Sequence, residues 1–143
     1  MRSPKRRFLA ALCAVLLAVT GLAAEAPVLV AMPKQARSKV VEVALSYAGA
    51  PYLSGGVDER GFDCSGFVYR VFYQSVGASL PRTASAQYAF REPVDFAKLQ
   101  PGDLLFFNTT GSISHVGIYE GDGRFVHAAS EGPRRGVIES SLS

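Results

Sequence analysis

The sequence predicts one α+β domain, with helices in the first half of the chain and a small antiparallel β-sheet in the second half. Two patterns support this division. Up to residue 90 the apolar residues recur at helical spacing, whereas from residue 104 they form short runs separated by turn residues. Residues 27–143 are enough for one domain with its own core, and they contain no internal repeat.

Residues 1–26 are predicted to be a secretory signal peptide. Basic residues precede an unbroken apolar stretch at 8–19, and small residues follow it as candidate cleavage positions: Ala23, Ala24 and Ala26. An uncleaved membrane anchor is the alternative, but a membrane-spanning helix normally needs about 20 apolar residues. We therefore expect a secreted protein that keeps no stable membrane anchor after cleavage.

The net charge of +3 comes from this leader. Cleavage after Ala26 removes four of the 15 Lys and Arg residues and one of the 12 Asp and Glu residues, which leaves eleven of each. A chain without a basic surplus has little attraction for a nucleic-acid backbone, so no nucleic-acid partner is predicted.

A short tether at 27–33 leads into the first predicted helix, which spans Lys34–Tyr47. Gly49 and Pro51 end this helix. Its apolar residues recur on one broad face: Val40, Val41, Val43, Ala44 and Tyr47. The next segment, 52–62, is rich in glycine and charged residues and is predicted to be a loop.

The second predicted helix begins at Cys64. Asp63 is a suitable N-cap, and Gly77 is a suitable stop at the other end. The buried face is expected to contain Phe67, Val68, Val71, Phe72 and Val76. A shorter helix is predicted around 83–90, after the turn at 80–82.

Four strands of one antiparallel sheet are predicted at 104–107, 115–119, 124–128 and 137–139. The turn at 100–103 leads into the first strand. Gly102 suits the positive φ of a type II turn, and Asp103 is expected to fix this turn rather than to react.

Cys64 is the one cysteine that remains after removal of the leader, so it has no partner for an internal disulfide. An unused thiol in an exported protein is exposed to oxidation. At a helix N-terminus, unpaired N–H groups and the helix dipole stabilise a thiolate, and we expect them to lower the thiol pKa. Cys64 is therefore interpreted as a nucleophile; the alternative is a buried cysteine that packs as a small apolar residue.

The two histidines of the chain, His115 and His127, flank the turn sequence at 120–123. Their strands are therefore predicted to pair as a hairpin. If the loop is odd in length and centred on Gly121 or Asp122, both imidazoles lie on one face, directly opposite or one diagonal step apart. The opposite face then supplies core residues: Val116, Ile118 and Val126.

This arrangement predicts a Cys-His-His triad. His115 shares the proton of Cys64, and His127 bonds the far nitrogen of His115 and holds its tautomer. A zinc site made of the same three residues is an alternative, although no two of them have a short chelating spacing.

Several ordered motifs resemble the NlpC family of bacterial cell-wall cysteine peptidases over roughly residues 40–140. From residue 52 the chain reads Tyr-Leu-Ser-Gly-Gly, then Gly-Phe-Asp-Cys-Ser-Gly-Phe-Val, then Leu-Pro-Arg-Thr with Gln87. From residue 101 it reads Pro-Gly-Asp-Leu-Leu-Phe-Phe, then Ser-His-Val-Gly-Ile-Tyr and Phe-Val-His-Ala. Agreement of these motifs in order is far more specific than any one of them.

The resemblance implies a papain-like α+β fold and cleavage of peptide bonds in peptidoglycan stem or cross-link peptides. It places the nucleophile at Cys64, the base at His115 and the third polar residue at His127. It also identifies Tyr52 as the tyrosine that helps to stabilise the oxyanion. Substrate binding is expected from three further residues: Asp63, Ser65 and Arg82. Asp63 as a plain helix cap and Arg82 as a solvated surface residue remain alternatives.

We further expect a monomer that uses no metal or organic cofactor and works in the periplasm or cell-wall space. Members of this compact type usually continue beyond the strand at 137–139, so a truncated C-terminus or an unprotected edge strand is expected for the domain at 34–143. A non-catalytic peptidoglycan-binding module, and a thiol amidase or acyltransferase on the same fold, stay open as alternative functions.

Overall fold

The predicted α+β class is confirmed by the computed structural model, which describes residues 32–90 and 92–143. The predicted signal peptide and most of the tether lie outside these residues. The helices are α1 (Lys34–Ser46), α2 (Cys64–Val76), α3 (Ala84–Ala89) and the 3-10 helix η1 (Phe96–Lys98). The strands are β1 (Val57–Asp58), β2 (Gly61–Phe62), β3 (Leu104–Asn108), β4 (Ile113–Gly121), β5 (Arg124–Ala129) and β6 (Gly136–Ser141).

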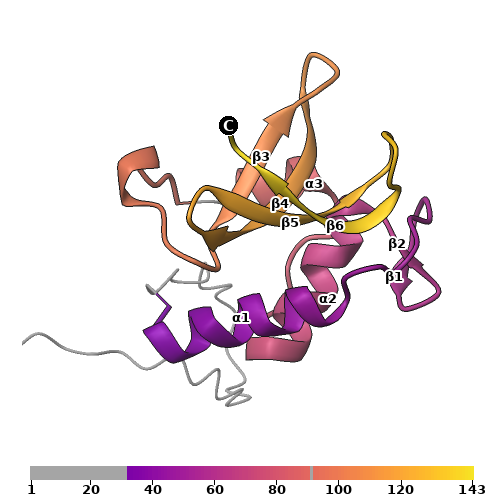
Figure 1. The fold of residues 1–143 in the computed structure, drawn as a ribbon. Coiled ribbons are helices and arrows are strands. Elements are labelled where there is room, and N and C mark those ends of the chain that lie inside the picture. The colour runs from indigo at the N-terminus through magenta and orange to yellow at the C-terminus, as the bar shows by residue number, and fades with distance from the viewer. Residues whose placement is uncertain (1–31, 91) are drawn as a thin grey trace, which may run out of the picture. The chain divides into compact units, whose positions relative to one another are not determined.

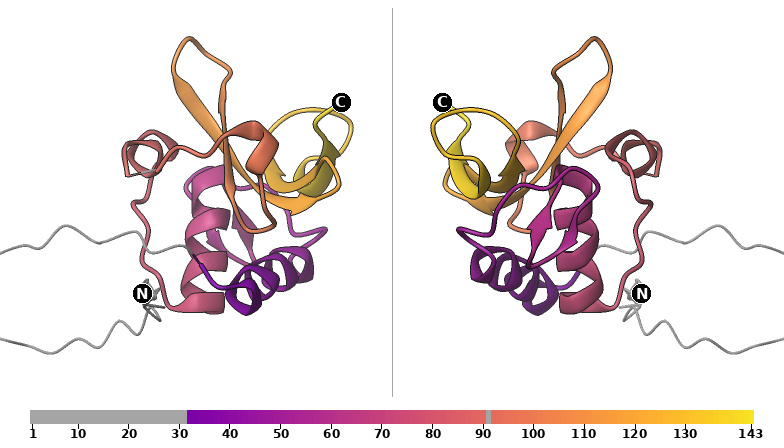
Figure 2. Two further views of the ribbon diagram at one scale, coloured as in Figure 1. Left: turned by 90° about the vertical axis from the view of Figure 1, so that its left-hand side faces the viewer. Right: turned by 90° about the vertical axis from the view of Figure 1, so that its right-hand side faces the viewer.

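Strands β3 to β6 form an antiparallel sheet in sequence order, β3-β4-β5-β6. Figures 1 and 2 show α1 and α2 together on one side of this sheet. The core between these layers is built from the predicted apolar faces, including Val40 of α1, Phe67, Val68 and Val71 of α2, and Val116, Ile118 and Val126 of the sheet, all fully buried. Complete burial of each such side chain contributes about 1.5–3 kcal/mol to folding.

Helix α2 begins and ends as the sequence predicts. The Asp63 carboxylate accepts a hydrogen bond from the Gly66 N–H at 2.7 Å, which caps the first turn. Gly77 adopts the left-handed conformation (φ 68°) that commonly ends a helix. Cys64 is therefore the first residue of a well-defined helix.

The turn before β3 is also confirmed. Gly102 has a φ of 89°, and the Asp103 N–H donates to the Gln100 carbonyl at 3.0 Å. The Asp103 carboxylate accepts from the Gln100 N–H at 2.9 Å, as expected of a residue that fixes the turn. Arg37 of α1 pairs with the same carboxylate at 2.6 Å, so the turn is also tied to the helical layer.

The hairpin of β4 and β5 combines a two-residue turn with a bulge. Asp122 and Gly123 have φ values of 53° and 70°, which are typical of a type I′ turn. Ile118 pairs with Val126, but a register shift follows before Gly121 pairs with Arg124. The extra residue gives an odd offset centred on Asp122, one of the two centres that put both histidines on one face.

Two expectations need correction, and one further element is present. The segment 52–62 is not only a loop, because it contains the short antiparallel pair β1 and β2 and a bridge from Tyr52 to Phe62. The helix η1 was not predicted. The edge strand β6 is partly covered: the Gly49 N–H donates to the Val137 carbonyl at 2.9 Å, and the Val137 N–H donates to the Ala50 carbonyl at 2.8 Å.

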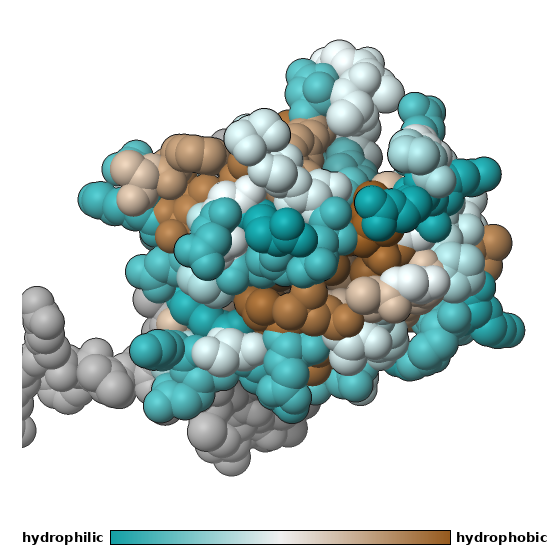
Figure 3. Space-filling view, in the orientation of Figure 1, coloured by the Kyte–Doolittle hydropathy of each residue, from teal (hydrophilic) through white to brown (hydrophobic). Residues whose placement is uncertain are grey.

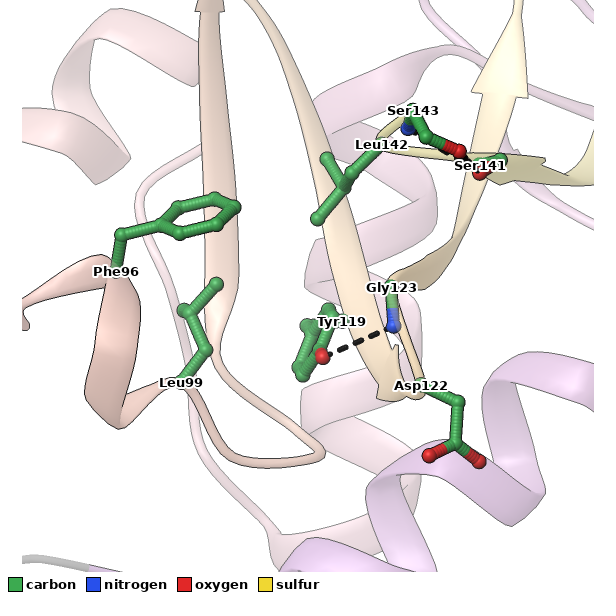
Figure 4. A pocket seen from close by; sticks show the side chains of 8 residues that line it. All are labelled: Phe96, Leu99, Tyr119, Asp122, Gly123, Ser141, Leu142 and Ser143. Carbon is green, nitrogen blue, oxygen red and sulfur yellow. Dashed lines mark hydrogen bonds between the residues drawn. The ribbon is translucent and has the colours of Figure 1, made fainter.

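Most of the face seen in Figure 3 is hydrophilic, with hydrophobic patches over α1 and in the region of η1. Phe96 of η1 is 72% exposed. A hollow of about 300 Å³ lies next to it, lined by Phe96, Leu99, Tyr119, Asp122, Gly123, Ser141, Leu142 and Ser143 (Figure 4). In the described part of the chain, no helix combines the length and apolar character needed to cross a membrane.

Candidate active site

A second hollow, of about 250 Å³, lies at the N-terminus of α2 and brings predicted site residues together. Cys64 lines it beside Tyr52, Asp63 and Ser65. The rest of the lining comes from the start of α3 and the start of β4: Thr83, Ala84, Ser85, Ile113 and Ser114. Unlike the hollow of Figure 4, it contains a thiol, so we identify it as the candidate active site.

Cys64 is half-buried, and its thiol Sγ contacts the carbonyl oxygen of Ser114 at 3.7 Å. Ser114 directly precedes His115, so the thiol lies beside the strand that carries the predicted base. Among the described residues no hydrogen bond joins Cys64 to His115 itself. The contact in the structure is a weak S–H donor directed at a backbone acceptor.

The expected lowering of the Cys64 pKa is wrong in direction. Burial raises the pKa of the Cys64 thiol, and the nearby Asp63 carboxylate also raises it. Backbone N–H groups, that of Val116 first and those of Ser65 and Cys64 after it, lower the pKa but do not outweigh the burial. The helix N-terminus therefore acts as predicted, but the loss of solvent around the sulfur has the larger effect.

His115 and His127 lie on one face of the β4–β5 hairpin, and their rings are hydrogen-bonded. The distance from His115 Nε2 to His127 Nδ1 is 2.7 Å. The two residues are one diagonal step apart, because Gly117 and not His115 lies beside His127. The expected direct contact of the imidazoles is thus present in the structure.

Aromatic side chains surround the histidine pair on the same face of the sheet. Phe125 packs against His127 with ring centroids 4.7 Å apart, and Phe107 packs against His115 at 5.8 Å. Burial lowers the pKa of His115. Burial and the neighbouring His115 lower the pKa of His127 to about 4. Both imidazoles are therefore neutral near pH 7.

Ser140 of β6 is a further member of this cluster that the sequence analysis missed. Its Oγ lies 2.8 Å from His127 Nε2, on the side of the ring away from His115. Ser140 pairs with Phe125, and Ile138 pairs with His127, so the serine reaches the ring diagonally. The alternating pattern of β6 places Ser140 on one face with Ile138, but nothing in the sequence fixes the register of β6 against β5.

Asp63, Ser65 and Arg82 also come together in one hydrogen-bonded cluster. The Arg82 guanidinium donates to both Asp63 oxygens, at 2.9 and 2.7 Å, and to Ser65 Oγ at 3.0 Å. Asp63 accepts in addition from the Gly55 N–H at 3.0 Å. Gln87 of α3 is buried and donates to the carbonyls of Ser65 and Pro81. The cluster thus joins the start of α2 to the segment that leads into α3.

Tyr52 lines the hollow from the segment before β1. Burial raises the pKa of its hydroxyl, and the neighbouring Cys64 and Asp63 raise it further, so Tyr52 keeps its proton as a hydrogen-bond donor. The guanidinium carbon of Arg135, in the loop between β5 and β6, lies 5.9 Å from the centre of the Tyr52 ring. Across residues 32–90 and 92–143, no group of three or more His, Cys, Asp or Glu side chains is arranged to hold a metal ion.

The chain is similar in sequence to known proteins. The profile of the NlpC/P60 family matches residues 49–142. A probable endopeptidase of Haemophilus influenzae is 39% identical over 113 residues, which cover 78% of this chain and 68% of that protein. The murein DD-endopeptidase MepS/murein LD-carboxypeptidase of Escherichia coli is 37% identical over 107 residues, covering 75% and 55%. The gamma-DL-glutamyl hydrolase of Bacillus subtilis is 46% identical over 100 residues, covering 68% of this chain but only 24% of that protein.

Solved structures show the same fold. The NlpC/P60 domain of the peptidoglycan hydrolase SagA matches with a TM-score of 0.66 and 34% identity, covering 74% of this chain and 89% of that domain. The peptidoglycan hydrolase RipB of Mycobacterium tuberculosis matches with a TM-score of 0.64 and 32% identity, covering 78% and 63%. By sequence and by fold, the chain belongs to the NlpC/P60 family.

Proposed function

We propose that the protein is a cysteine endopeptidase that hydrolyses amide bonds in the stem or cross-link peptides of peptidoglycan. Cys64 is the nucleophile, His115 is the base and His127 orients His115. The observation that carries this proposal is the hydrogen bond between the imidazoles of His115 and His127. His115 directly follows Ser114, whose carbonyl contacts the Cys64 thiol. Relatives named as endopeptidases and a peptidoglycan hydrolase support the substrate class.

The reaction begins when the thiol turns from Ser114 toward His115 Nδ1, the ring nitrogen that does not bond His127. The sulfur attacks the amide carbon while His115 takes the thiol proton. The Tyr52 hydroxyl and the Cys64 backbone N–H stabilise the resulting oxyanion. The C–N bond then breaks, and His115 passes its proton to the leaving nitrogen. His115 then takes a proton from water as the water oxygen attacks the thioester carbon, and it passes this proton to the sulfur when the C–S bond breaks.

Asp63, Ser65 and Arg82 bind polar groups of the stem peptide in this proposal. They form one charged, hydrogen-bonded cluster next to the nucleophile. The two relatives with specific names differ in the bond that their names describe, a DD-endopeptidase in one case and a gamma-DL-glutamyl hydrolase in the other. We favour a cross-link or stem bond that involves diaminopimelate, and product analysis identifies it.

A peptidoglycan hydrolase acts outside the cytoplasm, so the proposal includes export by residues 1–26 into the periplasm or cell-wall space. The basic and apolar composition of this segment supports export. Cell fractionation combined with the intact mass of the protein measures it. A full-length protein confined to the cytoplasm would contradict export without affecting the proposed chemistry.

The deciding experiment digests purified sacculi and identifies the released fragments by mass spectrometry. We expect wild type to release peptides, and Cys64→Ala and Cys64→Ser to lower the rate at least ~10³-fold. Ser85→Ala, which changes another polar residue of the same hollow, is the matched control and should stay close to wild type. Equal release by wild type and Cys64→Ala would exclude the proposed cysteine peptidase. Binding of sacculi without any release would favour the non-catalytic peptidoglycan-binding module.

The same assay separates the triad from the zinc alternative. Because the proposed mechanism uses only protein groups, a chelator should leave activity unchanged, whereas a thiol alkylator should abolish it. Loss of activity with the chelator, restored by zinc, would overturn the Cys-His-His proposal in favour of a metal site.

A further inference from the structure

A chain of hydrogen bonds crosses three neighbouring strands of the sheet. His115 of β4 bonds His127 of β5 at 2.7 Å, and His127 bonds Ser140 of β6 at 2.8 Å. The first bond uses Nε2 of His115 and Nδ1 of His127, and the second uses Nε2 of His127. His115 Nε2 and both ring nitrogens of His127 therefore each have a hydrogen-bond partner.

The role of each nitrogen follows from the direction of proton transfer. A neutral imidazole has one N–H donor and one acceptor nitrogen. If His115 Nδ1 is to accept the thiol proton, the hydrogen of neutral His115 must be on Nε2, where it is donated to His127 Nδ1. His127 must then carry its own hydrogen on Nε2, which faces Ser140 Oγ.

We propose that Ser140 is a positioning residue, which accepts the His127 Nε2–H and thereby keeps both histidines in the tautomers that leave His115 Nδ1 free as the base. This inference rests on the proposed function. A hydroxyl suits the position because its oxygen accepts a hydrogen bond from an imidazole N–H. An orienting group of this kind is known to affect catalysis through the tautomer of the base.

The surroundings of the pair support this assignment. His127 is packed against Phe125 and is neutral near pH 7, because its pKa is lowered to about 4 by burial and by His115. It therefore has one N–H to donate and needs one acceptor. Without Ser140, the hydrogen of His127 can move to Nδ1, where it faces the Nε2–H of His115. Two N–H groups cannot bond each other, so the hydrogen of His115 then favours Nδ1, and this nitrogen can no longer act as the base.

The test compares Ser140→Ala, Ser140→Thr and Ser141→Ala. Ser141 is the matched control, because it is the next residue of β6 and its hydroxyl bonds Ser143 instead of the histidines. The first readout is the pair of ¹⁵N chemical shifts of His127, which report the nitrogen that carries the hydrogen. The second is kcat and KM on soluble peptidoglycan fragments, at temperatures where thermal melts show every variant folded.

We expect Ser140→Ala to lower kcat about 10–100-fold with little change in KM, and to shift His127 away from the Nε2–H tautomer. Ser140→Thr should retain the wild-type kcat and the Nε2–H tautomer of His127, and Ser141→Ala should leave both unchanged. Retention of wild-type kcat and of the Nε2–H tautomer in Ser140→Ala would overturn the inference while Cys64-dependent cleavage still stands. If wild type cleaves nothing, the proposed function fails, and the ¹⁵N spectra of wild type and Ser140→Ala alone decide the role of Ser140.

Discussion

Cys64 and His115 differ from exposed residues of their kinds because both are partly shielded from water. Burial raises the pKa of the Cys64 thiol and lowers the pKa of His115. Near pH 7 the site therefore contains a neutral thiol and a neutral imidazole instead of a thiolate and an imidazolium. In the proposed mechanism, this state requires His115 to act as a general base that takes the proton as the sulfur attacks.

This ionisation state predicts a slow reaction of Cys64 with alkylating agents at neutral pH. A raised pKa means a smaller thiolate fraction, and each unit of increase lowers that fraction about 10-fold below the pKa. We expect the rate of iodoacetamide addition to Cys64, followed by mass spectrometry from pH 6 to pH 10, to keep rising at a pH where a free thiol has levelled off. The same protein in guanidinium chloride is the matched control. A plateau between pH 6 and pH 8 would show a preformed thiolate–imidazolium pair and contradict the prediction.

At the scale of the elements, local sequence signals predicted several features that neighbouring residues determine, but they missed the short β1–β2 pair and the helix η1. The N-cap, the left-handed stop of α2 and the histidine hairpin are all set by residues a few positions apart. Ser140 was not predictable, because the loop at 130–135 leaves the register of β6 against β5 open. The predicted direction of the Cys64 pKa was wrong for a related reason. The main determinant of this pKa is burial against other elements, which the helix position does not reveal.

Asp63 shows how one side chain serves helix α2 and the site together. Its carboxylate caps the helix through Gly66, holds the Gly55 N–H and pairs with Arg82. Asp63→Ala should lower the free energy of unfolding by about 1–2 kcal/mol, because the cap is lost. Asp63→Asn should retain most of the stability, since asparagine caps helices about as well as aspartate. Guanidinium denaturation followed by circular dichroism measures both. Equal losses for the two variants would show that the charge pair with Arg82, and not the cap, stabilises this region.

At the scale of the whole domain, backbone hydrogen bonds connect the helical first half to the sheet at the start of β6. Two backbone hydrogen bonds join Val137 to Gly49 and Ala50, immediately after α1. This junction covers part of an edge that would otherwise present unpaired backbone groups. It also holds the strand that carries Ser140, so the fold of the first half supports the position of the histidine cluster.

Gly136, next to this junction, allows the two segments to approach closely. A Cβ at Gly136 would lie 2.3 Å from the Ala50 carbonyl oxygen, which belongs to the backbone and cannot move without breaking the pairing. Gly132 is the matched control, because its φ of 96° is comparable to the 118° of Gly136 but a Cβ there meets nothing within 4 Å. Both alanine variants therefore carry the strain of a positive φ, and only Gly136→Ala adds the clash.

We expect Gly136→Ala to lower the free energy of unfolding by at least about 2 kcal/mol more than Gly132→Ala, because it also disrupts buried backbone hydrogen bonds. Thermal and guanidinium unfolding of the two variants measure this difference. Similar losses would mean that the junction tolerates the added methyl group. In that case the close approach of Gly136 to Ala50 would not be what fixes the start of β6.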